Sequence, residues 1–193
     1  MTYIDTVPEG EATGATAEVY ANDREVYGVL PNFTRALSLR PEVYSAWRQL
    51  NGAIKAGMDL RRYELATVAA AQRLRSTYCM LAVLLDQFLE PEALRAVVAD
   101  RASAGLDAAD VAVMDLAEKV ADDATSIDQA DIDRLRSLEF SDADILGVVL
   151  AAAARCFFSK ALDALGAEPD AKYASMDPAL RDALTVGRAI AEG

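Results

Sequence analysis

The sequence predicts an all-α fold, and three observations carry that prediction. Apolar residues make up 53% of the 193 residues, and alanine supplies much of that share. Alanine and leucine enter helices at little cost in free energy, whereas the β-branched and aromatic residues that favour strands are modest in number. Apolar positions recur at helical spacing, and no segment has a credible strand pattern. We therefore expect a single helical domain over residues 1–193.

Gly, Pro and N-cap residues divide the chain into its expected elements. An N-terminal arm is expected over 1–12, a helical core over 13–175 and a C-terminal helix within 176–193. Pro41 and Pro91 suit the first turns of helices, and Gly28 and Gly166 suit helix ends. The helices expected are 13–27, 33–39, 41–56, 60–74, 77–89, 91–99, 108–120, 129–138, 142–165 and 178–191.

Capping residues support several of these starts. Asp59 and Asp107 precede the helices at 60 and 108, and Ser126 or Asp128 precedes the helix at 129. Ser141, with an acid three residues later, resembles a capping box for the long helix 142–165. Trp47 lies on the apolar stripe of the helix 41–56, so we expect it in the core.

Charge and composition exclude several classes of function. The formal net charge of −12 disfavours nucleic acid and anionic membrane surfaces as partners. The chain has no histidine, which excludes Ser-His and Cys-His nucleophilic mechanisms within one chain and makes a zinc site improbable. No cofactor and no metal are therefore expected.

The expected location is the cytoplasm. Two cysteines do not form a disulfide framework. The first residues lack the charged and apolar regions of a signal peptide. The longest apolar run, Ile145 to Ala154, is too short to span a bilayer, and we expect no membrane association.

The most informative stretch of the sequence runs from Tyr63 to Phe88. Within it, Cys79 follows a polar break and lies three residues after Ser76, a good N-cap type. If Ser76 caps the next helix, Cys79 lies in the first turn, where backbone N–H groups and the helix dipole favour a thiolate. A reactive thiol is one interpretation, and a small buried apolar residue is the other.

Glu64 is the candidate base for that thiol. It lies twelve residues before Ser76, which is about 18 Å along one unbroken helix. The two can meet only if the chain turns at the polar break and folds back. A carboxylate beside a thiol can accept its proton, whereas an exposed first-turn acid would only favour the helix dipole.

Other residues near this stretch have weaker claims. Tyr78 either points its hydroxyl into the same pocket or packs in the core. Cys156 lies in an alanine-rich apolar run and is expected in the core. Arg155 beside it is unusual, because a charge that ends a ten-residue apolar run needs a carboxylate partner or a polar cleft.

The spacing of these residues resembles a known signature. The alkylhydroperoxidase D and carboxymuconolactone decarboxylase superfamily has Glu, eleven residues, Cys-x-x-Cys, three residues and His. Here these positions hold Glu64, Ser76, Cys79 and Val83. The flanking residues 29–47 and 140–170 also resemble its peroxidase-related branch, so that the resemblance covers roughly residues 3 to 175.

The resemblance implies an all-α, alkylhydroperoxidase-D-like helical domain that assembles into dimers, trimers or hexamers. In that family, paired cysteines reduce peroxides, and a glutamate and a histidine relay protons. Glu64 would be the relay acid, Cys79 the cysteine that attacks peroxide, and Tyr78 a neighbour between the two cysteine positions. Ser76 cannot form the disulfide and Val83 cannot relay a proton.

The sequence therefore leaves three hypotheses open. The first is a one-cysteine thiol peroxidase with Cys79 as nucleophile, Glu64 as base, Tyr78 and Ser76 as pocket donors, and an external thiol as reductant. The second is an inactive oligomeric binding or scaffold protein. The third is a cofactor-free lyase or isomerase that uses Glu64 alone.

Overall fold

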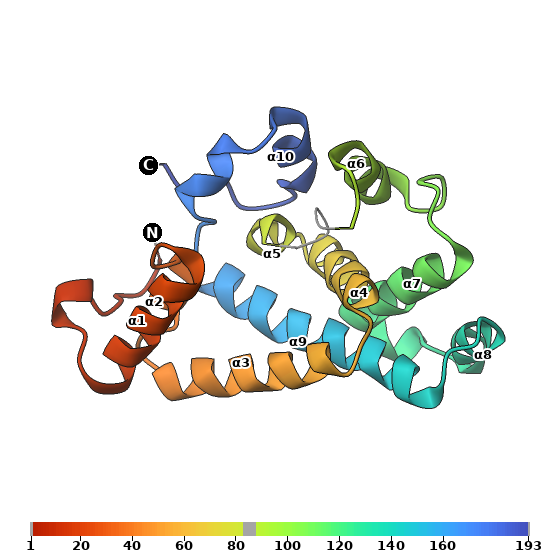
Figure 1. Cartoon of the computed structure of the whole chain (residues 1–193), viewed down its shortest axis with the longest axis horizontal. Helices are drawn as coiled ribbons and strands as arrows, with labels where there is room; N and C mark the ends of the chain where they lie inside the picture. Colours follow the sequence, from red (N-terminus) through yellow and green to blue (C-terminus); the bar gives the residue numbers. More distant parts are fainter. Residues whose placement is uncertain (1, 83–87, 193) are drawn as a thin grey trace.

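The structure is a computed structural model that describes residues 2–82 and 88–192 (Figure 1). The described residues form helices and loops and contain no strand, which confirms the all-α prediction. The α-helices are α1 (Gly14–Tyr27), α2 (Asn32–Ala36), α3 (Pro41–Ala56), α4 (Leu60–Arg73), α5 (Thr77–Leu81), α6 (Pro91–Asp100), α7 (Ala108–Asp123), α8 (Gln129–Ser137), α9 (Asp142–Leu165) and α10 (Pro178–Leu184). Short 3-10 turns are η1 (Glu9–Glu11), η3 (Ala124–Ser126) and η4 (Ala171–Ser175).

The core is built around α4, which packs against α7 and α9, while α3 lies along α9 (Figure 1). Every residue of α4 from 63 to 71 is buried, including Glu64 and Thr67. Alanine at positions 66, 69, 70 and 71 keeps the side chains short on most sides of this helix. Neighbouring helices can therefore approach its backbone closely, as expected from an alanine-rich sequence.

Among the described helices, α9 alone is long and apolar enough to cross a membrane, judged by length and composition only. Within the protein 44% of its most apolar stretch is buried, and it packs against α3, α4 and α7. These contacts are those of a core helix. The expectation of no membrane partner stays a prediction.

Most helix starts lie where the capping residues predict them. The side chains of Asp59, Asp107 and Ser141 each accept a backbone N–H of the following first turn. Asp128 caps α8, and Ser126 belongs to the preceding 3-10 turn. At the other end of α9, Gly166 adopts a left-handed conformation with φ of 74°, as a C-terminal glycine commonly does.

The helix predicted over 77–89 is shorter in the structure. It ends at Leu81, with Ala82 as its C-terminal cap, and Phe88 and Leu89 are not helical. The intervening residues 83–87 lie outside the described residues, and Val83, the position of the motif histidine, is one of them. Ser76 occupies the N-cap position, but its side chain caps no backbone N–H group.

The C-terminal helix is also shorter than predicted, because α10 ends at Leu184 instead of 191. Residues 185–192, here called the C-terminal strap, run past the loop between α4 and α5. Arg75 Nε donates to the Val186 carbonyl at 3.2 Å, and the Gly187 N–H donates to Thr77 Oγ1 at 2.8 Å. Residues 186 and 187 thus form hydrogen bonds with residues distant in sequence instead of the helical hydrogen bonds predicted for 178–191.

The strap, η4 and α10 cover the side of α5 opposite α3, and α10 packs against α6 (Figure 1). α5 therefore lies between the α9 core and the C-terminal segment, and all five of its residues are buried.

Candidate functional site

Glu64 is buried, with 3% of its surface exposed. The interpretation of this residue as an exposed first-turn acid is therefore wrong. Its Oε1 accepts a hydrogen bond from Lys55 Nζ of α3 at 3.0 Å. The same ammonium lies 5.2 Å from the ring centre of Tyr63, whose hydroxyl donates to Asn51 Oδ1 at 2.8 Å. A buried carboxylate held by an ammonium is an arrangement that can accept or return a proton.

Cys79 is also buried, with 2% exposed, and it lies near enough to Arg155 of α9 to influence the pKa of that guanidinium. Burial opposes the charge on this guanidinium, but Cys79, Tyr63 and Glu64 favour it and together raise the pKa of Arg155. One buried cation therefore interacts with both the thiol and the candidate base. A guanidinium beside a thiol favours the thiolate, the nucleophilic form.

Arg155 resolves two questions that the sequence leaves open. The chain folds back at the polar break, so that Glu64 and Cys79 act on the same guanidinium despite their separation along the sequence. The helix dipole that the sequence suggests for Cys79 is short-ranged here, because α5 has only five residues. The charge at the end of an apolar run was the sequence signal for this residue.

A cavity of about 600 Å³ opens beside this group. Glu64, Lys55 and Arg155 line it, and so does Tyr173 from η4. The pKa of Tyr173 is raised, mainly by burial and then by Asp170, Tyr27 and Cys79. Aromatic rings make up much of the remaining surface: Tyr27, Phe33, Tyr44, Trp47, Tyr63 and Phe158.

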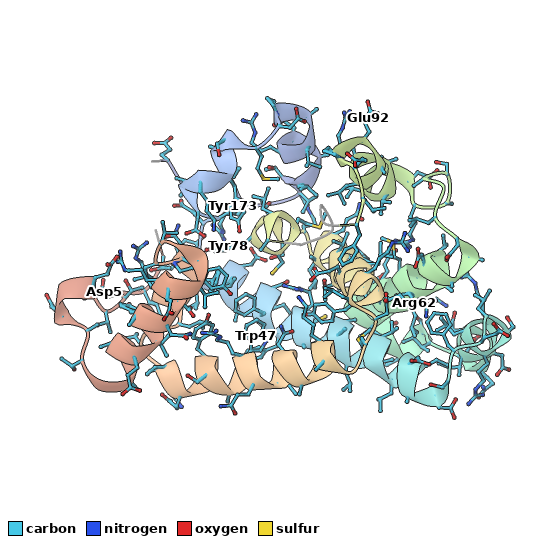
Figure 2. The ribbon with its side chains drawn as sticks, in the orientation of Figure 1. Asp5, Trp47, Arg62, Tyr78, Glu92 and Tyr173 are labelled. Atoms are coloured by element: carbon cyan, nitrogen blue, oxygen red, sulfur yellow. The ribbon has the colours of Figure 1, made fainter. Side chains whose placement is uncertain are left out.

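Trp47 was expected in the core, and it is partly buried there while also lining the cavity. Its ring stacks on Phe158, with ring centres 3.9 Å apart and planes within 8°. The sticks in Figure 2 place Trp47 between α3 and the central helices, with Tyr78 and Tyr173 together beside α5. Sequence reasoning did not identify Lys55, Lys172 or Tyr173, because nothing local marks them as facing one space.

Tyr78 is buried, and its hydroxyl is turned away from the Arg155 group. It donates to Asp170 Oδ2 at 2.6 Å and accepts the Phe33 N–H at 3.0 Å. Burial and the neighbouring Asp170 carboxylate raise the pKa of Tyr78 well above its usual range. Tyr78, like Cys79, does not line the cavity, and its hydroxyl is already used by Asp170 and Phe33, so the geometry favours a packing role over that of a pocket donor.

Ser76 is completely buried and does not line the cavity either. Its hydroxyl makes no hydrogen bond of good geometry with any described residue. Its electrostatic neighbour is Asp163 of α9, whose pKa is raised by burial and partly lowered again by Ser76. The structure thus brings Glu64 and Cys79 to Arg155, and places Ser76 and Tyr78 in other surroundings.

Cys156 is half-buried on α9, next in sequence to Arg155, and burial raises the pKa of its thiol. Successive helical residues point about 100° apart, so its side chain takes a different direction from the guanidinium. Both cysteines are free thiols. No cluster of three or more potential metal ligands occurs within residues 2–82 and 88–192.

No protein-family model matches the sequence, and no curated protein matches it significantly. Solved structures do match. The alkylhydroperoxidase AhpD core of an uncharacterised peroxidase-related protein from Ralstonia eutropha JMP134 gives a TM-score of 0.78 at 18% identity, over 97% of this chain and 98% of that chain. The chain has the AhpD-like helical fold.

Two further structures agree with this assignment. An uncharacterised peroxidase-related protein from Silicibacter sp. TM1040 gives a TM-score of 0.75 at 22% identity, over 89% of this chain and 91% of that one. A cysteine-to-alanine variant of the debrominase Bmp8, in complex with 2,3,4-tribromopyrrole, gives 0.72 at 15% identity, over 95% and 96% of the two chains. At these identities the likeness establishes the AhpD-like fold and not the chemistry.

Proposed function

We propose that this protein is a peroxidase-related thiol enzyme that uses one cysteine, with Cys79 as nucleophile and Glu64 as proton carrier. The observation that carries the proposal is the buried Arg155, which interacts with both of these side chains at the wall of an apolar cavity. In this proposal the guanidinium stands beside the thiol in place of the missing histidine. Tyr78 and Ser76 support the architecture and take no part in the chemistry.

In the proposed first step, Glu64 accepts the proton of the Cys79 thiol. The thiolate attacks one oxygen of a hydroperoxide, an S–O bond forms and the O–O bond breaks. The leaving alkoxide takes the proton from Glu64 and departs as an alcohol. The peroxide is reduced by two electrons, and Cys79 is oxidised to a sulfenic acid.

A second step must regenerate the thiol. Ser76 occupies the position of the partner cysteine, so we propose that an external low-molecular-weight thiol resolves the sulfenic acid. It forms a mixed disulfide with Cys79 and releases water. A second thiol attacks this disulfide, frees Cys79 and leaves as the oxidised dimer of the reductant.

The test is the consumption of an organic hydroperoxide in the presence of dithiothreitol. We expect Cys79→Ser to lower the rate by about a hundredfold or more, because the sulfur nucleophile is lost. Cys156→Ser is the matched control, and its rate should equal that of the wild type. Mass spectrometry after dimedone trapping should locate the sulfenic acid at Cys79.

An inert wild-type thiol at millimolar peroxide would refute the peroxidase proposal. It would favour the second hypothesis, an inactive binding or scaffold protein with the same fold. The third hypothesis, a lyase or isomerase that uses Glu64, would gain support from an activity that Glu64→Gln removes and Cys79→Ser leaves intact.

A second candidate reaction is thiol-dependent reductive dehalogenation of an aromatic compound. The aromatic lining of the cavity favours it, and Bmp8, named a debrominase, has the same fold. The Cys79 thiolate would take the halogen, and the ring carbon would take a proton in its place. An external thiol would then displace halide from sulfur, and a second thiol would restore Cys79.

This candidate is tested by the release of bromide from brominated phenols or pyrroles in the presence of a thiol. Bromide release that requires Cys79, without turnover of hydroperoxide, would select dehalogenation over peroxide reduction. Hydroperoxide turnover without bromide release would select the opposite assignment.

We also propose that the protein forms homo-oligomers in the cytoplasm. Three large apolar side chains of α9 are exposed at helical spacing: Leu146 at 55%, Leu150 at 42% and Phe157 at 50%. On α3, Val43 and Leu50 are exposed as well, and α3 packs against α9. Sedimentation velocity should give a dimer or larger, and Leu150→Glu should shift it toward the monomer.

A further inference from the structure

The cavity beside Cys79 is positive, although the protein is strongly acidic. The chain has a formal net charge of −12. One carboxylate, that of Glu64, lines the cavity. Four cationic side chains line it as well: Arg48, Lys55, Arg155 and Lys172. An excess of one sign of charge in an apolar cavity attracts a ligand of the opposite sign.

Three of these cations already interact with acidic groups of the protein. Arg48 pairs with the buried carboxylate of Asp23, and Lys55 pairs with Glu64. Arg155 interacts with the Cys79 thiol and with Glu64. Each of these three cations therefore has an acidic group of the protein near it, although the buried Nε of Arg155 makes no hydrogen bond with the described residues.

Lys172 differs from the other three. No carboxylate of the described residues lies within 4 Å of its Nζ, although the chain is rich in acids. The ammonium lies instead over two aromatic rings, 5.9 Å from the centre of Tyr27 and 5.4 Å from that of Tyr173. Both rings line the cavity, so the charge is held at its edge by cation–π contacts.

A second unpartnered donor belongs to the same cavity. Trp47 Nε1 is buried and has no hydrogen-bond partner among the described residues. The indole is fixed by stacking, because its ring lies parallel to Phe158 on one side and near Tyr44, with centres 6.3 Å apart, on the other. A buried N–H group without an acceptor costs free energy, which a ligand that accepts this hydrogen bond would recover.

We propose that this cavity binds a planar aromatic molecule that carries an anionic group such as a carboxylate. The ring packs among the aromatic walls, the anion pairs with Lys172, and a ligand oxygen accepts the Trp47 N–H. A volume of about 600 Å³ suits a ligand of one or two rings. The inference names the substrate class of the site in the proposed function and rests on that site.

The test compares 1-naphthoate with its uncharged analogue 1-naphthamide, by titration calorimetry on the full chain. The acid is expected to bind about fivefold more tightly than the amide, as a partly exposed ion pair allows. Trp47 is the only tryptophan of the chain and lines the cavity, so its fluorescence should change on titration with either compound.

Variants assign the preference to residues. Lys172→Gln should bring the acid-to-amide ratio close to one, whereas Lys172→Arg should keep it. The matched control is Lys160→Gln, an exposed lysine outside the cavity, which should leave the ratio unchanged. Trp47→Phe keeps an aromatic ring and removes the N–H group, and should weaken the binding of both compounds.

Binding is measured in Cys79→Ser as well, so that a failure of thiol chemistry and a failure of the ligand assignment are distinguishable. Naphthoate affinity retained in that variant supports the inference whatever the reaction. An amide that binds as tightly as the acid, or a preference that survives Lys172→Gln, would overturn it.

Discussion

The loop between α4 and α5 has two sides, and they differ in what they contact. On the cavity side, Cys79 and Glu64 lie near a buried guanidinium, and Glu64 and Arg155 line a cavity of about 600 Å³. On the strap side, Ser76 is fully buried and Thr77 accepts a hydrogen bond from the C-terminal strap. Ser76 and Cys79, three residues apart in one motif, therefore have different surroundings.

A spacing that resembles a family motif therefore does not assign a role to every residue in it. Tyr78 lies next to Cys79 in sequence, yet both hydrogen bonds of its hydroxyl are used by Asp170 and Phe33. The partners of each side chain, more than its position in the motif, distinguish Cys79 near Arg155 from Tyr78 at Asp170.

The largest expected effect is at the cavity side, on Arg155. Arg155→Met should slow the alkylation of Cys79 by iodoacetamide at neutral pH by about tenfold or more, because a charge-assisted contact with the thiolate is lost. Arg155→Lys should retain part of the rate. Equal alkylation rates of Cys79 in the wild type and in Arg155→Met would show that Arg155 does not influence the thiol, and would contradict the proposed difference between the two sides of the loop.

The strap side is tested by Gly187→Ala. A Cβ at this position would collide with the backbone carbonyl of Arg75, which cannot move like a flexible side chain. We expect a loss of about 1–3 kcal/mol in the free energy of unfolding, measured by urea denaturation. Gly10→Ala, where a Cβ would meet nothing within 4 Å, should change it by less than about 0.5 kcal/mol.

Tyr78→Phe tests whether the Tyr78 hydroxyl contributes to stability, to the reaction rate or to both. Removing the hydroxyl leaves the buried Asp170 carboxylate without one hydrogen bond, so we expect about 1–3 kcal/mol lower stability. The peroxidase or dehalogenase rate should stay within about twofold of the wild type under folding conditions. If the rate falls while the stability is unchanged, the Tyr78 hydroxyl takes part in the reaction.

The smallest expected effect is on stability at alkaline pH. Burial and neighbouring carboxylates raise the pKa of Tyr78 and Tyr44 above the ordinary value of 10.0. The unfolded chain therefore loses these protons first, and the stabilisation, fully present below pH 10, falls as the pH rises above it. Urea denaturation from roughly pH 9 to 11 should show a shallower decline for Tyr78→Phe than for the wild type.

The sequence predicted most of the fold, because helix starts and stops are local. Caps such as Asp59 and Ser141 and the glycine at 166 act on the backbone within one turn, and the structure confirms them. Two helices were predicted too long, 77–89 and 178–191. The second ends at Leu184, and the residues after it contact the start of α5, where the Gly187 N–H donates to Thr77. No pattern within either segment encodes that contact.

For the candidate site, the sequence by itself named two candidate reactive groups, Glu64 and Cys79, and the unusual charge at Arg155. Only the tertiary structure decided that these three interact, that Ser76 and Tyr78 lie elsewhere, and that Lys172 and Trp47 face the same cavity. The physical reason is the range of the forces involved. Capping and periodicity act over a few residues, whereas a buried cation beside a thiol depends on how α4, α5 and α9 pack together.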